Sequence, residues 1–143
     1  MIKPAWILVA TFIALAACWP GWRLDEGIAG QKVDPIEFAE AARAFAARYQ
    51  VGAVVEPPPG PVPMLVRRFE FWPALHLRPG QTYRLRLLAE DGIHSVVHDG
   101  REVLLIPGEV QELVLTPKPG EELELRCNEY CGLGHNRMRA KLN

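Results

Sequence analysis

The sequence predicts a mainly β protein whose short strands form an antiparallel β-sandwich or barrel, preceded by one apolar segment and one short helix. The first observation is a series of Pro-Gly and Asp-Gly turn signals at 79–80, 91–92, 99–100, 107–108 and 119–120. The second is that segments rich in valine, leucine and tyrosine separate these turns, and that polar and apolar residues alternate from Tyr83 to Leu87. Strands spaced roughly 8 to 12 residues apart with a turn between each pair are typical of such folds. The formal net charge of −1 over 143 residues gives no indication of a nucleic-acid partner.

Residues 1–23 are predicted to anchor the chain to a membrane. The run from Ala5 to Trp22 holds 18 uncharged residues, which as a helix spans about 27 Å, close to a hydrocarbon core of about 30 Å. Alternatively, the run up to Ala17 is the apolar part of a secretory signal, and Leu15-Ala16-Ala17-Cys18 resembles a bacterial lipobox, in which Cys18 becomes a lipid-modified N-terminus. Both interpretations hold the remaining chain on a membrane, outside the cytoplasm. A buried core helix is disfavoured because the run has no polar face.

Residues 24–63 are predicted to contain one helix and a proline-rich spacer. Asp34 can cap a helix and Pro35 suits its first position. Apolar residues follow at spacings of two to four as far as Tyr49, so we expect a helix over about 35–50. The stretch 54–64 contains five prolines and is predicted to be an extended, semi-rigid linker. The remaining residues, 64–143, would form the β domain.

The segment 127–138, CNEYCGLGHNRM, collects metal-binding side chains in one short loop. Cys127, Cys131, His135 and Met138 offer two thiols, an imidazole and a thioether, a set of donors that favours copper or zinc over magnesium or calcium. A further histidine would have to come from elsewhere, and His94 is favoured because it follows a turn at the start of a strand. The weaker candidates are His98, at the other end of that strand, and His76, which lies between two leucines.

Two alternative interpretations of this loop remain open from the residues alone. Exported cysteines commonly form disulfides, so Cys127 and Cys131 could pair with each other. Four donors, the two cysteines with His135 and His94, would also satisfy tetrahedral zinc. The disulfide leaves His135, Met138 and Glu129 without a role, and the zinc site leaves Met138 without one.

The loop resembles that of subunit II of the haem-copper oxidases. Six positions match at fixed spacing in Cys127-x-Glu129-x-Cys131-Gly132-x-x-His135-x-x-Met138, and Asp91-x-x-His94 precedes them. The resemblance implies a cupredoxin-like Greek-key sandwich that carries the dinuclear copper centre CuA. The Asn-Tyr pair in CNEYC and the single anchor are similar to the B-type oxidases, whereas Glu129 is similar to the A-type enzymes.

The resemblance implies a role for each matching residue. Cys127 and Cys131 would bridge two copper ions as thiolates. His94 would bind one copper and His135 the other. Weak donors would be the Met138 thioether and the backbone carbonyl of Glu129, and the Glu129 carboxylate would hold a magnesium ion shared with subunit I. Asp91 would support the His94 side of the site.

The same resemblance implies partners and a location. The domain would accept electrons from cytochrome c or a similar donor and pass them to haem in catalytic subunit I, which would reduce oxygen, on the periplasmic or outer face of a bacterial cell membrane. Phe69, Phe71 and Trp72 in FEFWP are candidates for the contact surface or the electron path, although ordinary strand core explains Phe69 and Phe71 equally well. Alternatives are a CuA subunit of a nitric oxide reductase and a free membrane-tethered copper carrier or delivery protein. A nitrous oxide reductase domain is disfavoured because that family usually has an aromatic residue in place of Glu129.

Overall fold

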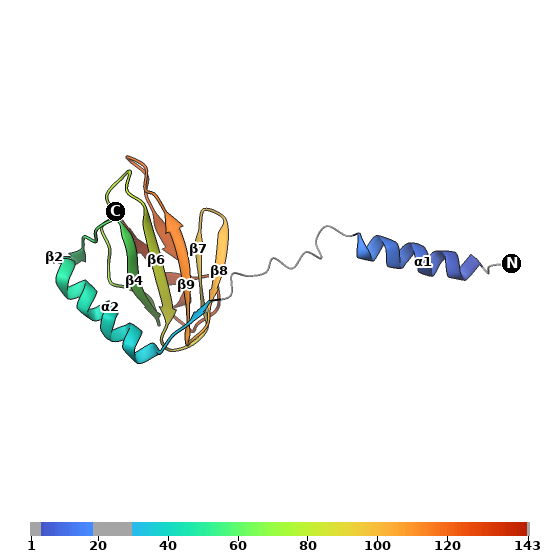
Figure 1. Cartoon of the computed structure of the whole chain (residues 1–143), viewed down its shortest axis with the longest axis horizontal. Coiled ribbons are helices and arrows are strands. Elements are labelled where there is room, and N and C mark those ends of the chain that lie inside the picture. The colour runs from blue at the N-terminus through green and yellow to red at the C-terminus, as the bar shows by residue number, and fades with distance from the viewer. Residues whose placement is uncertain (1–3, 19–29, 143) are drawn as a thin grey trace.

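The computed structural model describes residues 4–18 and 30–142 (Figure 1). The first helix, α1 (Pro4–Ala17), is apolar and ends just before the exposed Cys18. Among the described helices, none is both long and apolar enough to cross a membrane. The predicted span to Trp22 extends into residues outside the described part of the chain.

The folded body is a sandwich of two sheets, as the turn signals predicted (Figure 1). The larger sheet has the order β1-β9-β6-β4-β5 and the smaller one the order β11-β10-β7-β8. The strands of the larger sheet are β1 (Gln31–Lys32), β4 (Gly60–Arg67), β5 (Glu70–Trp72), β6 (Tyr83–Ala89) and β9 (Glu109–Leu115). Those of the smaller sheet are β7 (His94–His98), β8 (Arg101–Leu105), β10 (Glu124–Arg126) and β11 (Arg139–Lys141). The pair β4 and β6 is parallel and all the other paired strands are antiparallel.

Helix α2 (Pro35–Tyr49) follows the sequence prediction closely and packs on the larger sheet (Figure 1). The Asp34 carboxylate accepts hydrogen bonds from the amides of Ile36 and Glu37, and Pro35 occupies the first turn, where a missing amide costs nothing. Its buried face joins the sheet in one apolar cluster that contains Phe38, Ala39, Ala42, Leu65, Leu88 and Val110. The helix is therefore part of the sandwich domain.

The predicted linker over 54–64 is wrong in this structure. After the helix the chain forms a small hairpin from β2 (Gln50–Val51) and β3 (Val54–Val55), and β4 already begins at Gly60. From Gly60 onward β4 pairs with β6 through seven residues, and Val62 and Met64 are fully buried. The folded unit therefore does not begin at residue 64, because the preceding strand and helix are built into it.

The smaller sheet has the predicted metal-binding loop, residues 127–138, at one end. Asp99 and Gly100 have positive φ angles of 49° and 73°, the conformation that a tight hairpin turn between β7 and β8 requires. At the other end of β7 lies His94, its first residue. The loop after β10 returns through a short 3₁₀ helix, η2 (His135–Arg137), into β11, which pairs with β10.

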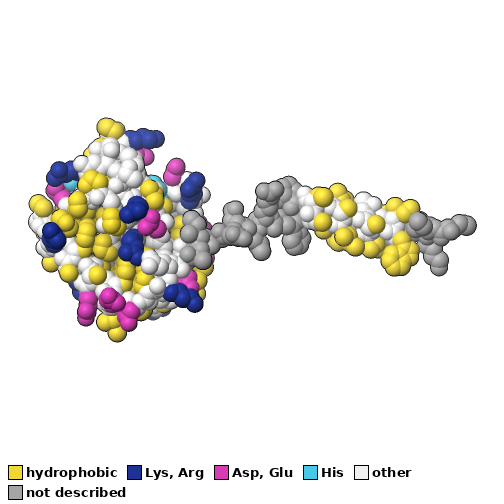
Figure 2. All heavy atoms as spheres, in the orientation of Figure 1, with side chains coloured by type: hydrophobic (Ala, Val, Ile, Leu, Met, Phe, Trp, Pro, Cys, Tyr) yellow, Lys and Arg dark blue, Asp and Glu magenta, His cyan; other side chains and the backbone are white. Residues whose placement is uncertain are grey.

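Charged side chains of both signs are interspersed over the visible face of the folded body (Figure 2). Positive and negative groups also pair across the surface, for example Arg67 with Glu70 and with Glu90. Such pairs are at least partly exposed to solvent and contribute little to stability. The charge distribution on this face therefore gives no indication of a strongly charged partner.

Candidate metal centre

Neighbouring strands of the smaller sheet bring the predicted donors to one end of the sandwich. Strand β10 leads directly into Cys127, β11 begins directly after Met138, and the adjacent β7 begins at His94. The Cys127 amide donates a hydrogen bond to the Met138 carbonyl at 3.1 Å, which closes the loop at its base. The sheet thereby fixes both ends of the loop beside the distant histidine.

Each thiol lies against a different imidazole. The Cys127 sulfur is 3.8 Å from His94 Nδ1, and the Cys131 sulfur is 3.7 Å from His135 Nδ1. Ligand atoms of His94, Cys127 and Cys131 all lie within 4.8 Å of one another, and both cysteines are free thiols. The structure therefore gathers two thiol–imidazole pairs and contains no disulfide between these two cysteines.

Two weaker donors complete the group, one beside each thiol. The backbone carbonyl of Glu129 lies 3.3 Å from the Cys127 sulfur. The Met138 thioether lies 3.6 Å from the Cys131 sulfur and is 2% exposed. All six predicted donors thus meet in one place, whereas the Glu129 side chain points to solvent and is exposed.

The ring of His94 is held in one orientation by Asp91. The Asp91 carboxylate lies 2.8 Å from His94 Nε2, and its other oxygen accepts a hydrogen bond from the Arg68 amide at 2.9 Å. Partial burial opposes ionisation of Asp91, but these two hydrogen bonds and the electrostatic attraction of His94 and Arg68 together hold the pKa of its carboxyl below the usual value. A carboxylate on Nε2 leaves Nδ1, the atom that faces Cys127, free to bind a metal.

The thiol environment favours bound protons when no metal is present. Burial, reinforced by the neighbouring Cys127, raises the pKa of the Cys131 thiol from 9.0 to about 11. A metal ion binds the thiolate and therefore has to displace that proton. Two buried sulfur donors beside two imidazoles whose Nδ1 atoms face them fit a soft metal ion such as copper.

The three aromatic candidates occupy different environments. Phe71 is 5% exposed in the core, and the half-buried Trp72 packs against the two apolar clusters. Phe69 does not belong to the strand core, because it lies in the turn between β4 and β5 and is 39% exposed. Core packing therefore explains Phe71, whereas Phe69 is a surface residue.

Phe69 covers the two glycines of the metal-binding loop. A Cβ atom at Gly134 would lie 2.5 Å from the Phe69 ring, and one at Gly132 would lie 3.2 Å from it. Gly132 also has a φ of +132°, which side chains disfavour. The glycines are needed both for the loop conformation and for the close approach of this ring.

Two contacts to the loop come from residues that the sequence analysis did not single out. Ser95 lies next to His94 and accepts hydrogen bonds from the amides of Asn128 and Glu129. Glu102 on β8 accepts both hydrogen bonds of the Asn128 side-chain amide at 3.1 Å. The position of Ser95 beside a predicted ligand was the one available signal, and no spacing in the sequence indicates Glu102.

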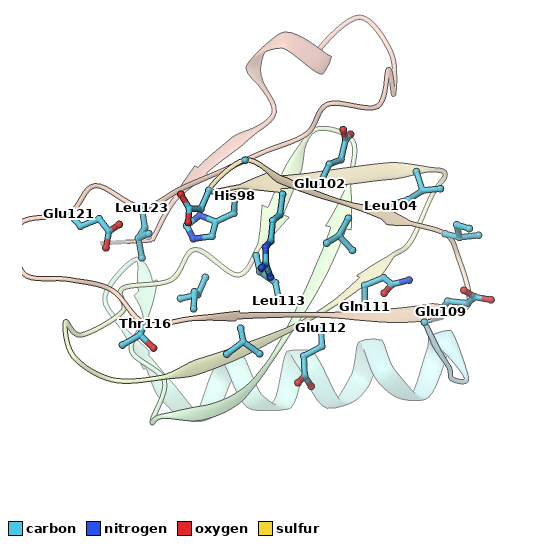
Figure 3. Close-up of a pocket in the computed structure, with 18 of the residues that line it drawn as sticks. His98, Glu102, Leu104, Glu109, Gln111, Glu112, Leu113, Thr116, Glu121 and Leu123 are labelled. Carbon is cyan, nitrogen blue, oxygen red and sulfur yellow. The ribbon is translucent and has the colours of Figure 1, made fainter. Parts of the chain in front are cut away.

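The remaining histidines lie away from this group. His76 is exposed in the segment after β5. His98, at the far end of β7, lines a groove of about 1270 Å³ between β8 and β9, together with Glu102, Gln111 and Leu113 (Figure 3). None of the six predicted donors is among the described residues that line this groove.

Fold and site together define a copper-binding domain of cupredoxin type. Two Thermus thermophilus proteins, both named cytochrome c oxidase subunit 2, are each 32% identical over 91 residues, which is 60% of this chain and 67% and 54% of their lengths. The chain therefore belongs to the cytochrome c oxidase subunit 2 family, and it is a component of an oxidoreductase complex. No family model matches the chain.

Solved structures share the fold. A chain from the structure of a haem-copper terminal oxidase dimer superposes with a TM-score of 0.56 and 23% identity, covering 96% of this chain and 92% of that one. The periplasmic domain of cytochrome oxidase subunit II (CoxB) of Bradyrhizobium japonicum superposes with a TM-score of 0.53 and 13% identity, over 58% of this chain and 81% of that one. Both likenesses support the cupredoxin-like sandwich.

Proposed function

We propose that this chain is the CuA-bearing subunit of a haem-copper oxidase, which receives electrons from a cytochrome c and passes them to haem in catalytic subunit I for oxygen reduction. The observation that carries the proposal is the pair of thiols, each facing its own imidazole and its own weak donor. Two sets of donors around two adjacent sulfurs suit two metal ions. The oxygen-reducing site would lie in the partner subunit.

The ligand roles are those that membership of this family implies. Cys127 and Cys131 would hold both copper ions as shared thiolates. Each copper site would be completed by one histidine and one weak donor, drawn from His94, His135, the Met138 thioether and the Glu129 carbonyl, which all lie beside these sulfurs. A four-coordinate zinc ion would use only four of these six donors. The number of donors therefore supports two copper ions over one zinc ion.

When bound, such a copper pair shares one unpaired electron over two metals and two sulfurs, so oxidation and reduction change the bond lengths little. The protein would keep the change small by holding its ligands rigidly. Asp91 fixes the His94 ring, and strands β10 and β11 fix the two ends of the loop. Burial of both cysteines limits the access of water to the sulfurs.

The donor would dock on an apolar surface beside the copper pair, which we call the docking face. A shallow hollow of about 710 Å³ is lined there by Phe69, Ile93, Tyr130, Cys131 and Leu133, among others. Leu133 is 95% exposed and Tyr130 is 73% exposed. Large exposed apolar side chains grouped in this way commonly mark a protein–protein contact. Phe69, which lines the hollow and covers the loop glycines, and Tyr130, whose ring centroid lies 5.9 Å from that of His135, would be aromatic contacts beside the metal.

The location would be the outer, periplasmic face of a bacterial membrane, with the chain held there by its N-terminal segment. The described part of that segment is the apolar helix α1, on which Trp6, Leu8 and Phe12 are all more than 60% exposed. A membrane helix that continues past α1 would use this surface, whereas lipid modification would make Cys18 the N-terminus and hold the chain by its lipid instead.

A magnesium ion at the interface with subunit I is a further part of the proposal. The Glu129 carboxylate is exposed beside the site while its carbonyl faces Cys127. The side chain is therefore available to a partner subunit without disturbing the proposed copper ligand.

A nitric oxide reductase subunit or a free copper carrier would have the same fold and loop. The comparisons do not favour either, because the relatives of significant identity are named cytochrome c oxidase subunit 2. Co-purification of the chain with a haem-bearing subunit that consumes oxygen would support the proposal over a free carrier.

The test is to load the reduced full-length chain with copper in detergent and to record its electron paramagnetic resonance and visible spectra. We expect about two copper ions per chain and a purple, mixed-valence signal with the electron shared over both coppers. Cys131→Ser should abolish that sharing because it removes one bridge, and Cys18→Ser is the matched control that removes a thiol outside the site. A lone zinc ion, a blue single-copper spectrum, or an unchanged signal in Cys131→Ser would contradict the proposal.

A further inference from the structure

Ser95 is a buried polar residue directly beside the proposed copper pair. It is the second residue of β7 and follows His94, and both side chains are fully buried. His94 and Ser95 are the two buried polar side chains in the described part of the chain. A buried hydroxyl costs free energy unless it is hydrogen-bonded, so its partners indicate what it does.

The Ser95 hydroxyl oxygen accepts two backbone hydrogen bonds from the metal-binding loop. The amide of Asn128 donates to it at 3.0 Å and the amide of Glu129 at 3.1 Å. These amides belong to the two residues that directly follow Cys127. Both therefore point inward toward β7, and the path of the loop between the two thiols is fixed at its start.

The position of the Glu129 carbonyl depends on these contacts. That carbonyl lies on the same residue as one of the two amides, and it reaches within 3.3 Å of the Cys127 sulfur. Rotation of the backbone at Glu129 would carry the carbonyl away from the sulfur. A single buried oxygen that holds both preceding amides restricts this rotation.

A second tether acts on the same segment from the surface. Glu102 on β8 accepts from the Asn128 side chain, and both residues are exposed. Exposed polar contacts compete with water and contribute less than buried ones. The Glu102 contact also acts on the side chain of Asn128 and does not touch the backbone of Glu129. Substitution of Glu102 is therefore a control that removes a tether of the loop without removing a partner of the Glu129 backbone.

We propose that Ser95 is a positioning residue that sets the distance of the Glu129 carbonyl from its copper ion and thereby tunes the reduction potential of the centre. The inference rests on the proposed function, in which that carbonyl is a weak donor to one copper. A weak donor shifts the potential of a copper site without deciding whether the metal binds.

The test uses the full-length chain with Ser95→Ala, Ser95→Thr and Glu102→Ala. In the reduced, metal-free protein, Ser95→Ala should speed hydrogen exchange at the Asn128 and Glu129 amides by roughly tenfold, because each amide loses a buried acceptor. With copper bound, Ser95→Ala should retain two copper ions but change the copper hyperfine pattern and the reduction potential. Ser95→Thr, which keeps the hydroxyl, should restore both properties, and Glu102→Ala should leave them close to those of the wild type.

If Ser95→Ala fails to fold, Ser95→Thr is compared with Ser95→Val, because the two share one shape and differ in the hydroxyl. Equal spectra and potentials for Ser95→Ala and Ser95→Thr, or for Ser95→Thr and Ser95→Val, would overturn the inference. An effect of Glu102→Ala as large as that of Ser95→Ala would also overturn it. Faster amide exchange with an unchanged potential would also overturn it, since the serine would then be structural. If the wild-type chain itself gives no two-copper signal, the proposed function fails. The exchange measurement is made on the metal-free protein, so it tests the Ser95 contact independently of that result.

Discussion

The Cys131 thiol lies where its charge is disfavoured unless a metal is bound. Burial, with Cys127 adjacent, raises its pKa from 9.0 to about 11 in the metal-free chain. A thiol whose pKa is higher in the folded state than in the unfolded state stabilises the fold below the unfolded value, and this contribution is lost as the pH rises through the folded value. The free energy of unfolding of the metal-free, reduced protein should therefore fall between about pH 9 and pH 11.

Urea unfolding at a series of pH values in the presence of a reductant measures this loss. Cys131→Ala lacks the titrating group, so its stability should depend less on pH over the same range. Copper binding should also remove the dependence, because the thiolate is then the ligand. An equally steep fall in Cys131→Ala would show that other groups cause it.

At this scale, the spacing of the sequence was sufficient to predict which side chains gather in the loop. Cys127, Cys131, His135 and Met138 lie within one loop, so their proximity is local and the structure brings them together with His94. Ser95 could not be predicted, because its role depends on the folded path of a loop more than thirty residues away. Buried hydrogen bonds between distant segments leave no periodic pattern in a sequence.

At the scale of elements, the ring of Phe69 packs the turn between β4 and β5 against the metal-binding loop. Phe69 occupies the space that a side chain at Gly134 would need, with ring atoms 2.5 to 2.7 Å from the position of a Cβ. Gly134→Ala should therefore lower the free energy of unfolding of the metal-free chain by about 1–3 kcal/mol, the usual cost of overpacking. Urea unfolding of the reduced protein measures the change.

A second substitution tests the cause. In a Phe69→Leu background the ring is absent, so Gly134→Ala should cost clearly less than it does in the wild type, and the difference is a coupling free energy. Gly100→Ala is the comparison for backbone effects, since its φ is +73° and nothing lies within 4 Å of its Cβ position. Equal costs of Gly134→Ala in the two backgrounds would exclude Phe69 as the cause.

The wrong prediction of a linker over 54–64 also has a physical explanation at the scale of elements. Prolines in a strand are tolerated where one side of that strand lacks a partner. Strand β4 pairs with β6 from Gly60 onward, but β5 pairs with it only at Leu65, Val66 and Arg67. Pro61 and Pro63 therefore lie in the part of β4 that has a strand partner on one side. The composition of 54–64 resembles that of a linker, and the pairing that overrides it is long-range.

Across the whole molecule, the larger sheet and its helix support a site that lies on the other sheet. The hydrogen bonds that tie the loop to other segments come from β7 and β8 of the smaller sheet, and its aromatic cover comes from the turn between β4 and β5. Leu85, Leu87, Leu105 and Leu125 join the two sheets in one core cluster that also contains both site cysteines. The rigidity that a copper centre requires therefore depends on the complete sandwich, including residues before 64.

This dependence predicts how the chain can be shortened. A fragment of residues 64–143 lacks α2 and begins inside β4, so it loses buried Phe38 and Val62 and uncovers Leu65 and Leu88. Each such side chain contributes about 1.5–3 kcal/mol when buried, and the sum matches the roughly 5–15 kcal/mol by which a typical domain is stable. The 64–143 fragment should be unfolded, whereas a fragment of residues 30–143 should fold cooperatively and bind copper.

Circular dichroism and urea titration of the two fragments, both lacking the apolar N-terminal segment, distinguish these outcomes. Ala42→Asp in the 30–143 fragment provides the matched test of the helix, because Ala42 is fully buried against the sheet and a carboxylate there has to be desolvated. That variant should resemble the short fragment in losing its cooperative transition. A 64–143 fragment that unfolds cooperatively with the same urea midpoint as the 30–143 fragment would contradict this prediction, because the smaller sheet and its metal centre would then fold without α2. We expect the long fragment to fold because α2 covers the larger sheet and β1 pairs with β9 at its edge, and that sheet supports the copper-binding end of the sandwich.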